Sequence, residues 1–178
     1  PFLSLRFAGS GRGSTGIAKT FQHYKKLSKF RLSMLVVATA ASGYVVGSGS
    51  TIHWPGLVWA SLGTFFAAAS ANTWNQVLEV QRDAAMLRTR ARPLPAGLLS
   101  RRHASVFGLL TGILGISIMA TQYNALTAGL GLAIIGLKVD IYRPLKVRSP
   151  INTGVGALVS EIPPLMGWAA AFTTTTNC

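Results

Sequence analysis

The sequence predicts an all-α integral membrane protein, a bundle of several transmembrane helices, and three observations support this class. Residues 32–78 contain no charged side chain, and neither do residues 103–137. Mean hydropathy is +0.41 although the formal net charge is +13. All 17 Lys and Arg side chains fall in three segments, residues 1–31, 82–102 and 138–148. Clustered cations between long apolar runs are typical of membrane proteins.

The same distribution argues against a nucleic-acid-binding protein. A protein with that net charge and that function would be polar, with Lys and Arg spread over its surface. Charged residues make up only 12% of this chain and flank its apolar runs. We therefore expect a lipid bilayer around the protein and no nucleic-acid partner.

Residues 1–31 form a basic N-terminal segment without an acidic residue. This composition fits two interpretations equally well. The segment is either the remainder of an organelle transit peptide or a basic juxtamembrane tail that leads into the first helix.

The first uncharged run, residues 32–78, is long enough for two spans, because a bilayer core needs about 20 apolar residues per helix. Gly, Ser and Pro residues between positions 47 and 56 supply a turn. We expect one helix over residues 32–46 and a second over residues 55–72 that continues through positions 75–83. This helix should end before Pro93, because proline disfavours helical geometry in the preceding residue.

The second uncharged run, residues 103–137, predicts two short spans with a break at residues 121–124, and its first helix begins near Ser100. A fifth apolar stretch, residues 151–172, should form a helix that is broken or kinked at Pro163 and Pro164. No structure can be assigned to the tail, residues 173–178.

The alternation of these spans predicts the orientation of the chain. All three basic segments fall on one side of the membrane, as the positive-inside rule requires. The polar end of the second helix lies on the same side.

That polar end carries Asn75, Glu79 and Asp83. Glu79 and Asp83 are two of the chain's 4 acidic residues, and Asn75 adds an amide. On an α-helix, side chains spaced by four residues form one ridge along one face. Carboxylate and amide oxygens suit a hard divalent cation. A solvated helix end with weak surface ion pairs explains the pattern about equally well. The arginines available for such pairs are Arg82, Arg88 and Arg90.

The surrounding residues resemble a known family. The pattern N-x-x-x-E-x-x-x-D-x-x-M-x-R-T-x-x-R-P-L-P at residues 75–95 resembles the first aspartate-rich motif of the UbiA-type intramembrane prenyltransferases. The form of this motif with Glu79, preceded by SAN at residues 70–72, resembles the motif in the branch of that family that farnesylates protohaem IX. The segments LSKFRLSMLVV and YRPLKVRSPINTGVGALVSEIPPLMGW resemble two further motifs of this branch, and the resemblance covers residues 24–172.

The resemblance implies a magnesium-dependent reaction. Mg²⁺ held by Asn75, Glu79 and Asp83 would bind the diphosphate of farnesyl diphosphate, and the farnesyl group would pass to a vinyl group of protohaem IX, giving haem O. Three cations would neutralise the remaining diphosphate charge. They are Arg88, Arg92 and Lys146. The family implies the mitochondrial inner membrane with the basic loops facing the matrix, or a bacterial plasma membrane.

The chain also departs from the family pattern. The family has nine spans and a second aspartate-rich motif, whereas residues 32–172 hold about five spans and no second acidic cluster. We therefore expect an incomplete membrane domain that is inactive by itself. Four charged positions differ from the family, and their roles stay open. They are Lys138, Asp140, Arg143 and Glu161.

Two other functions remain open on the sequence. A UbiA-type prenyltransferase of this kind could act on a quinone or chlorophyll precursor, although such relatives more often carry Asp at the position of Glu79. The chain could also be a non-catalytic membrane subunit or a transporter fragment whose arginines serve only topology.

Overall fold

The computed structural model describes residues 16–141 and 152–176, and every regular element within these ranges is helical. In chain order the elements are α1 (Gly16–Leu27), α2 (Phe30–Gly47), α3 (Trp54–Leu78), α4 (Val80–Ala85), α5 (Arg101–Gln122), α6 (Ala125–Gly136), the π-helical turn η1 (Leu137–Ile141) and α8 (Asn152–Thr176). The all-α class predicted from the sequence is therefore confirmed.

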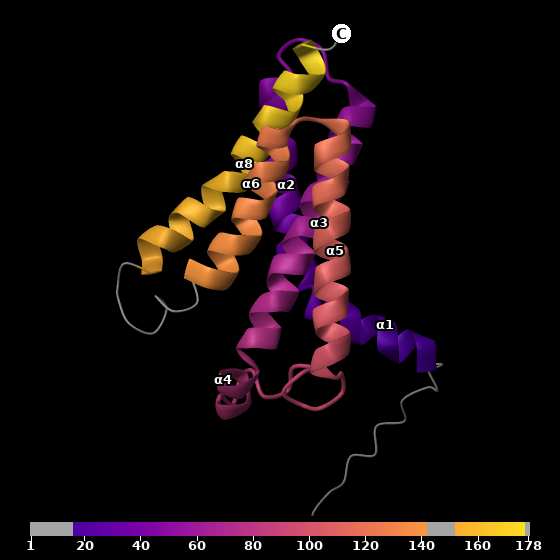
Figure 1. Cartoon of the computed structure of the whole chain (residues 1–178), viewed down its shortest axis with the longest axis vertical. Helices are drawn as coiled ribbons and strands as arrows, with labels where there is room; N and C mark the ends of the chain where they lie inside the picture. The colour runs from indigo at the N-terminus through magenta and orange to yellow at the C-terminus, as the bar shows by residue number, and fades with distance from the viewer. Residues whose placement is uncertain (1–15, 142–151, 177–178) are drawn as a thin grey trace, which may run out of the picture.

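The bundle is built around α3. This helix packs most extensively on α5 and also contacts α2, while α2 packs chiefly on α8. Helix α6 lies against α5, α8 and α3. Helix α1 extends sideways from one end of the bundle (Figure 1). Within the described ranges, two helices, α2 and α5, are long and apolar enough to cross a membrane by length and composition, and α6 is a shorter apolar helix.

Small residues set the closest approach between α3 and α5. A Cβ atom added to Gly112 would lie 2.8 Å from Ser70 Oγ, and one added to Gly115 would lie 2.8 Å from the Ala67 nitrogen. The Ser70 hydroxyl donates a hydrogen bond across this contact to the Gly108 carbonyl at 2.7 Å. Small residues at such positions are what let membrane helices approach closely.

Helix α8 was expected to be broken or kinked at Pro163 and Pro164, and it is not broken, because it continues through both residues. Its backbone at Pro164 lies directly against Gly43 of α2. Proline is tolerated inside a membrane helix where a neighbouring helix packs on the disturbed turn. The helix also includes residues 173–176, to which the sequence assigned no structure.

The two ends of the bundle differ in charge. The α2–α3 and α5–α6 turns, which contain no Lys or Arg, lie at one end, and the α1–α2 joint and the loop after α4 lie at the other (Figure 1). At the uncharged end His53 caps α3, since its Nδ1 accepts a hydrogen bond from the Gly56 N–H at 3.2 Å. Trp54 and Trp59 are exposed there, as expected for side chains at a membrane interface.

Candidate functional site

The segment that carries the predicted ridge is not one continuous helix. Helix α3 ends at Leu78, Glu79 has φ −95° and ψ 8°, and α4 begins at Val80. The backbone hydrogen bonds persist across this bend, from the Glu79 N–H to the Asn75 carbonyl at 3.0 Å and from the Asp83 N–H to the Glu79 carbonyl at 2.8 Å. The expected single helix is thus corrected to two helices that keep the four-residue spacing.

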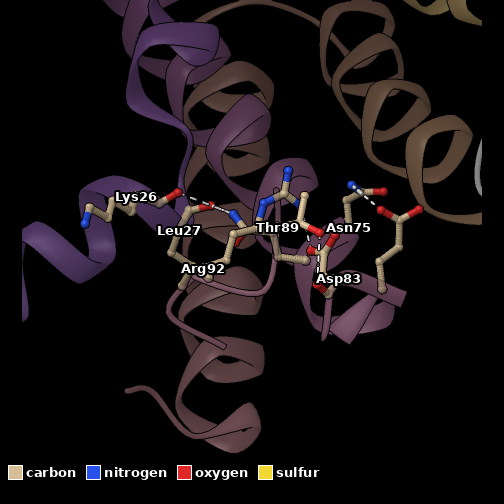
Figure 2. A network of polar contacts seen from close by, with 8 residues as sticks. Lys26, Leu27, Asn75, Asp83, Thr89 and Arg92 are labelled. Atoms are coloured by element: carbon tan, nitrogen blue, oxygen red, sulfur yellow. Dashed lines mark hydrogen bonds and ion pairs between the residues drawn. The ribbon is translucent and has the colours of Figure 1, made fainter. Parts of the chain in front are cut away.

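Two polar pairs form along this bent ridge. Asn75 Nδ2 donates a hydrogen bond to Glu79 Oε2 at 3.3 Å. Arg92 Nη1 forms an ion pair with Asp83 Oδ2 at 2.6 Å (Figure 2). Glu79 and Asp83 are each only 5% exposed. The interpretation as a solvated helix end is therefore wrong, because both carboxylates are withdrawn from water.

The loop after α4 folds back to bring Arg92 to Asp83. The Thr89 hydroxyl, 4% exposed, donates a hydrogen bond to the Asp83 carbonyl at 2.9 Å. Five residues later, Leu94 is buried in a cluster with Leu27 and Ala104. Figure 2 shows Thr89 and Arg92 both directed at Asp83. The loop is therefore fastened on both sides of the arginine.

The other predicted diphosphate ligands have different positions. Arg88 is exposed, and among the described residues it makes no ion pair with either acid. Arg82 and Arg90 are also exposed. Lys146 lies outside the described residues. Of the three predicted cations, the structure thus brings Arg92 to the ridge and leaves Arg88 on the surface of the loop.

A cavity of about 390 Å³ lies beside Asn75. Its apolar wall includes Leu32, Leu35 and Val36 of α2, together with Ile134 of α6. Its polar lining residues come from several elements. They are Lys29, Thr39, Asn72, Asn75, Lys138 and Ser160. The ridge therefore adjoins a space with one apolar wall and several polar groups.

Sequence reasoning missed Lys29 and Lys138 as residues of this cavity. Lys29 belongs to a basic segment that predicts only the membrane topology, and the sequence predicts no role for Lys138. Lys138 lies beyond the end of α6, in η1. Burial lowers the pKa of Lys138, and the positive charge of Lys29 lowers it further. No local pattern could have signalled this, because the two lysines are more than a hundred residues apart in the sequence.

The donor set fits a hard divalent cation. It consists of two buried carboxylates and one amide oxygen, and such oxygen ligands are those that Mg²⁺ accepts. The Asn75 amide uses its nitrogen toward Glu79, which leaves the Asn75 oxygen outside that hydrogen bond. In the described part of the chain, no group of three His, Cys, Asp or Glu side chains forms an alternative centre.

Comparison with known proteins decides the family. The family profile described as the UbiA prenyltransferase family matches residues 35–177. This chain belongs to that family. The match includes the ridge, the loop that carries Arg92 and most of the cavity wall.

Individual relatives agree with this assignment. The mitochondrial protoheme IX farnesyltransferase of Arabidopsis thaliana is 49% identical over 83% of this chain, and that of Homo sapiens is 43% identical over 82%. The protoheme IX farnesyltransferase of Cytophaga hutchinsonii is 39% identical over 86%. The chain spans 35%, 33% and 54% of the lengths of these relatives, respectively.

A solved membrane structure shares the fold. The structure of a digeranylgeranylglyceryl phosphate synthase superposes with a TM-score of 0.78 at 19% sequence identity. The superposition covers 85% of this chain and 53% of that structure. The helical membrane-protein fold predicted from the sequence is therefore shown.

Proposed function

We propose that this chain supplies the first half of the diphosphate site of a protohaem IX farnesyltransferase. The observation that carries the proposal is the pair of buried carboxylates, Glu79 and Asp83, on the same ridge as Asn75, which lines a cavity with an apolar wall. The names and identities of the relatives support farnesyl diphosphate and protohaem IX as the substrates. A second aspartate-rich motif from the rest of the protein would complete the site.

The residues of the ridge hold the metal in this proposal. Asn75, Glu79 and Asp83 would hold Mg²⁺ through their oxygens, and the bound metal would supply positive charge for the leaving diphosphate. Arg92 balances the charge of Asp83 and fixes the position of that carboxylate. Arg88 and Lys146 add positive charge around the departing diphosphate.

The reaction breaks the bond between the first farnesyl carbon and the diphosphate oxygen, and diphosphate leaves with the bonding electrons. The electron pair of a protohaem vinyl group forms the new carbon–carbon bond and leaves a positive charge on the other vinyl carbon. A water molecule adds its oxygen to that carbon and releases one proton to solvent, which gives the hydroxyl group of the product. Leu32, Leu35 and Val36 line the cavity. Their side chains keep water from the farnesyl cation before the vinyl group reaches it.

We place the protein in the mitochondrial inner membrane, or in the plasma membrane of a bacterium, because named relatives come from both settings. The basic end of the bundle then faces the matrix or the cytoplasm. The diphosphate reaches the ridge from that aqueous side, and the farnesyl chain extends along the apolar wall.

Asp83→Asn in the full-length protein tests the proposal. The change keeps the size of the side chain and removes its negative charge. We expect haem O formation from farnesyl diphosphate and protohaem to fall by at least 100-fold, with a higher Mg²⁺ requirement. Unchanged transfer with an unchanged Mg²⁺ requirement would overturn the assignment of the ridge as the metal site. Activity on a quinone precursor in place of haem would reassign the acceptor.

A further inference from the structure

A second cavity, of about 600 Å³, lies between α1, α3 and α5. Aromatic side chains from four helices line it, and we call it the aromatic groove. They are Tyr24 of α1, Phe30 of α2, Phe65 and Phe66 of α3, and Phe107 of α5. Among the described residues, none lines both this groove and the cavity beside the acid ridge. The groove is therefore separate from the proposed reaction site.

Contacts between rings fix the walls of the aromatic groove. The Tyr24 and Phe107 ring centroids are 4.9 Å apart, and this contact joins α1 to α5. The Phe30 and Phe65 centroids are 5.8 Å apart, and this contact joins α2 to α3. Tilted and edge-to-face ring pairs at such distances are favourable. All five aromatic residues keep part of their surface exposed, so the groove has fixed walls and stays open.

Two hydroxyl groups on the groove wall are directed to the protein backbone. The Thr111 hydroxyl donates a hydrogen bond to the Phe107 carbonyl at 2.8 Å, and the Ser28 hydroxyl donates one to the Lys25 carbonyl at 3.3 Å. Ala69 adds a further apolar side chain from α3. A polar ligand would lose its bonds to water along such a wall, whereas a hydrocarbon chain has none to lose. We therefore expect the occupant of the groove to be apolar along its length.

Lys25 adds a cation to this apolar groove. Its Nζ atom lies 5.0 Å from the centroid of the Phe30 ring, a favourable position for an ammonium group. Lys25 is exposed, and it belongs to α1, which extends sideways from the basic end of the bundle (Figure 1). In a bundle that spans a membrane, a helix in this direction lies along the surface, at the level of the lipid headgroups. The groove thus combines an apolar wall along the spans with a cation at headgroup level.

We propose that the aromatic groove binds an acyl chain of an anionic phospholipid from the surrounding bilayer, and that Lys25 contacts the phosphate of its headgroup. The groove is complementary to such a lipid in both of its parts. Hydrocarbon fits the aromatic walls, and a lysine near the membrane surface attracts anionic lipids. This inference goes beyond the proposed function, because the site holds neither a substrate nor the metal.

Native mass spectrometry of the full-length protein in detergent tests the proposal. The probes are phosphatidylglycerol, which is anionic, and phosphatidylcholine with the same acyl chains, which has no net charge. We expect the unaltered protein to bind phosphatidylglycerol more tightly. Lys25→Met should weaken the binding of phosphatidylglycerol by about 5-fold, the effect expected of one lysine at the membrane surface, and leave phosphatidylcholine unchanged.

Lys26→Met is the matched control for the headgroup contact. Lys26 is the next residue of α1 and is also exposed, but its side chain does not line the groove. The affinity for phosphatidylglycerol should therefore stay the same in this variant. Equal losses in Lys25→Met and Lys26→Met, or no loss in Lys25→Met, would overturn the proposal, because the lipid would then respond to the general charge of this end.

Phe66→Trp tests the acyl chain, because a larger ring occupies part of the groove. We expect both lipids to bind about 4-fold more weakly, the loss expected when one methylene group is displaced from apolar surroundings. Phe172→Trp makes the same change at an exposed residue of α8 and should leave both affinities unchanged. Unchanged binding in Phe66→Trp would remove the groove from the site.

Two competition measurements on the unaltered protein need no variant to fold. Glycerol 3-phosphate, a headgroup without acyl chains, should not displace phosphatidylglycerol, and displacement at equal concentration would contradict a role for the groove. Displacement by farnesyl diphosphate would make the groove a second site for the prenyl donor and overturn the proposal. If the full-length protein shows no preference for phosphatidylglycerol, another part of the protein covers the groove and the proposal is wrong. Asp83→Asn should leave the lipid affinities unchanged, so a failure of the metal ridge gives a different result.

Discussion

Arg92 Nη1 lies 2.6 Å from Asp83 Oδ2, and the two residues are joined across a loop that folds back on itself. The carboxylate side chain is 6% exposed and that of the arginine is 29% exposed. One side of the pair is thus buried against the bundle while the other reaches toward solvent. In the proposed function this carboxylate is a metal ligand, so Arg92 would hold that ligand in place and remain accessible to a diphosphate.

Arg92→Met should destabilise the protein because it leaves the Asp83 charge buried without its partner. We expect the free energy of unfolding to fall by about 1–2 kcal/mol, less than for a fully buried pair because Arg92 is partly exposed. Arg88→Met removes an exposed arginine from the same loop and should change stability by less than about 0.5 kcal/mol. Chemical unfolding in detergent compares the two variants. Equal losses of unfolding free energy in the two variants would show that the positive charge of the loop, and not the ion pair with Asp83, stabilises the protein.

Glu79→Gln should weaken Mg²⁺ binding without disturbing the fold. A glutamine oxygen can still accept the hydrogen bond from Asn75, so the α3–α4 bend keeps its side-chain contact. Loss of one anionic ligand should raise the Mg²⁺ concentration needed for half-maximal activity by about 10–100-fold.

Glu161→Gln makes the same change of charge at an exposed acid on α8 and serves as the control. Its Mg²⁺ requirement should match that of the unaltered protein. A Glu79→Gln enzyme with a normal Mg²⁺ titration would remove Glu79 from the metal ligands.

Thr89→Val should loosen the loop that carries Arg92. The Thr89 hydroxyl donates a hydrogen bond to the Asp83 carbonyl, and valine has the same shape without the donor. We expect a loss of about 1 kcal/mol in unfolding free energy, and Thr89→Ser should recover most of it. Thr121→Val removes an exposed hydroxyl at the opposite end of the bundle and should have no measurable effect. A stable Thr89→Val variant would mean that Leu94 alone fastens the loop.

The helices of the bundle could be predicted from the sequence because their signals are local. Uncharged runs and glycine-rich turns act on neighbouring residues, and they placed α2, α5 and α6 close to their observed bounds. The proline pair of α8 does not break the helix, which is one of the two outcomes expected from it. Its consequence depends on α2, whose Gly43 packs on that turn, and a local rule does not include this contact.

The candidate site could be predicted only in part, for the same reason. The spacing of Asn75, Glu79 and Asp83 is local, and the structure keeps it across the bend. The choice of Arg92 over Arg88 depends on how the loop folds back, and the position of Lys29 depends on amides more than 40 residues away. Whether these cations bind diphosphate stays a prediction.

The contact between α3 and α5 positions the ridge, and glycine substitutions test it. A Cβ atom at Gly115 would lie 2.8 Å from the Ala67 nitrogen and 3.0 Å from the Gly63 carbonyl oxygen, both backbone atoms that cannot rotate away. Gly115→Ala should therefore separate the helices and lower the unfolding free energy by about 1–3 kcal/mol.

Gly129→Ala in α6 is the matched control, since a Cβ atom there meets nothing within 4 Å. Alanine favours a helix over glycine by about 1 kcal/mol, so this variant should be as stable as the unaltered protein or more so. Because Gly115 lies at the middle of the pair and not at the ridge, its substitution should reduce activity through stability alone. Activity lost at temperatures where Gly115→Ala is fully folded would instead show that the α3–α5 spacing sets the geometry of the site.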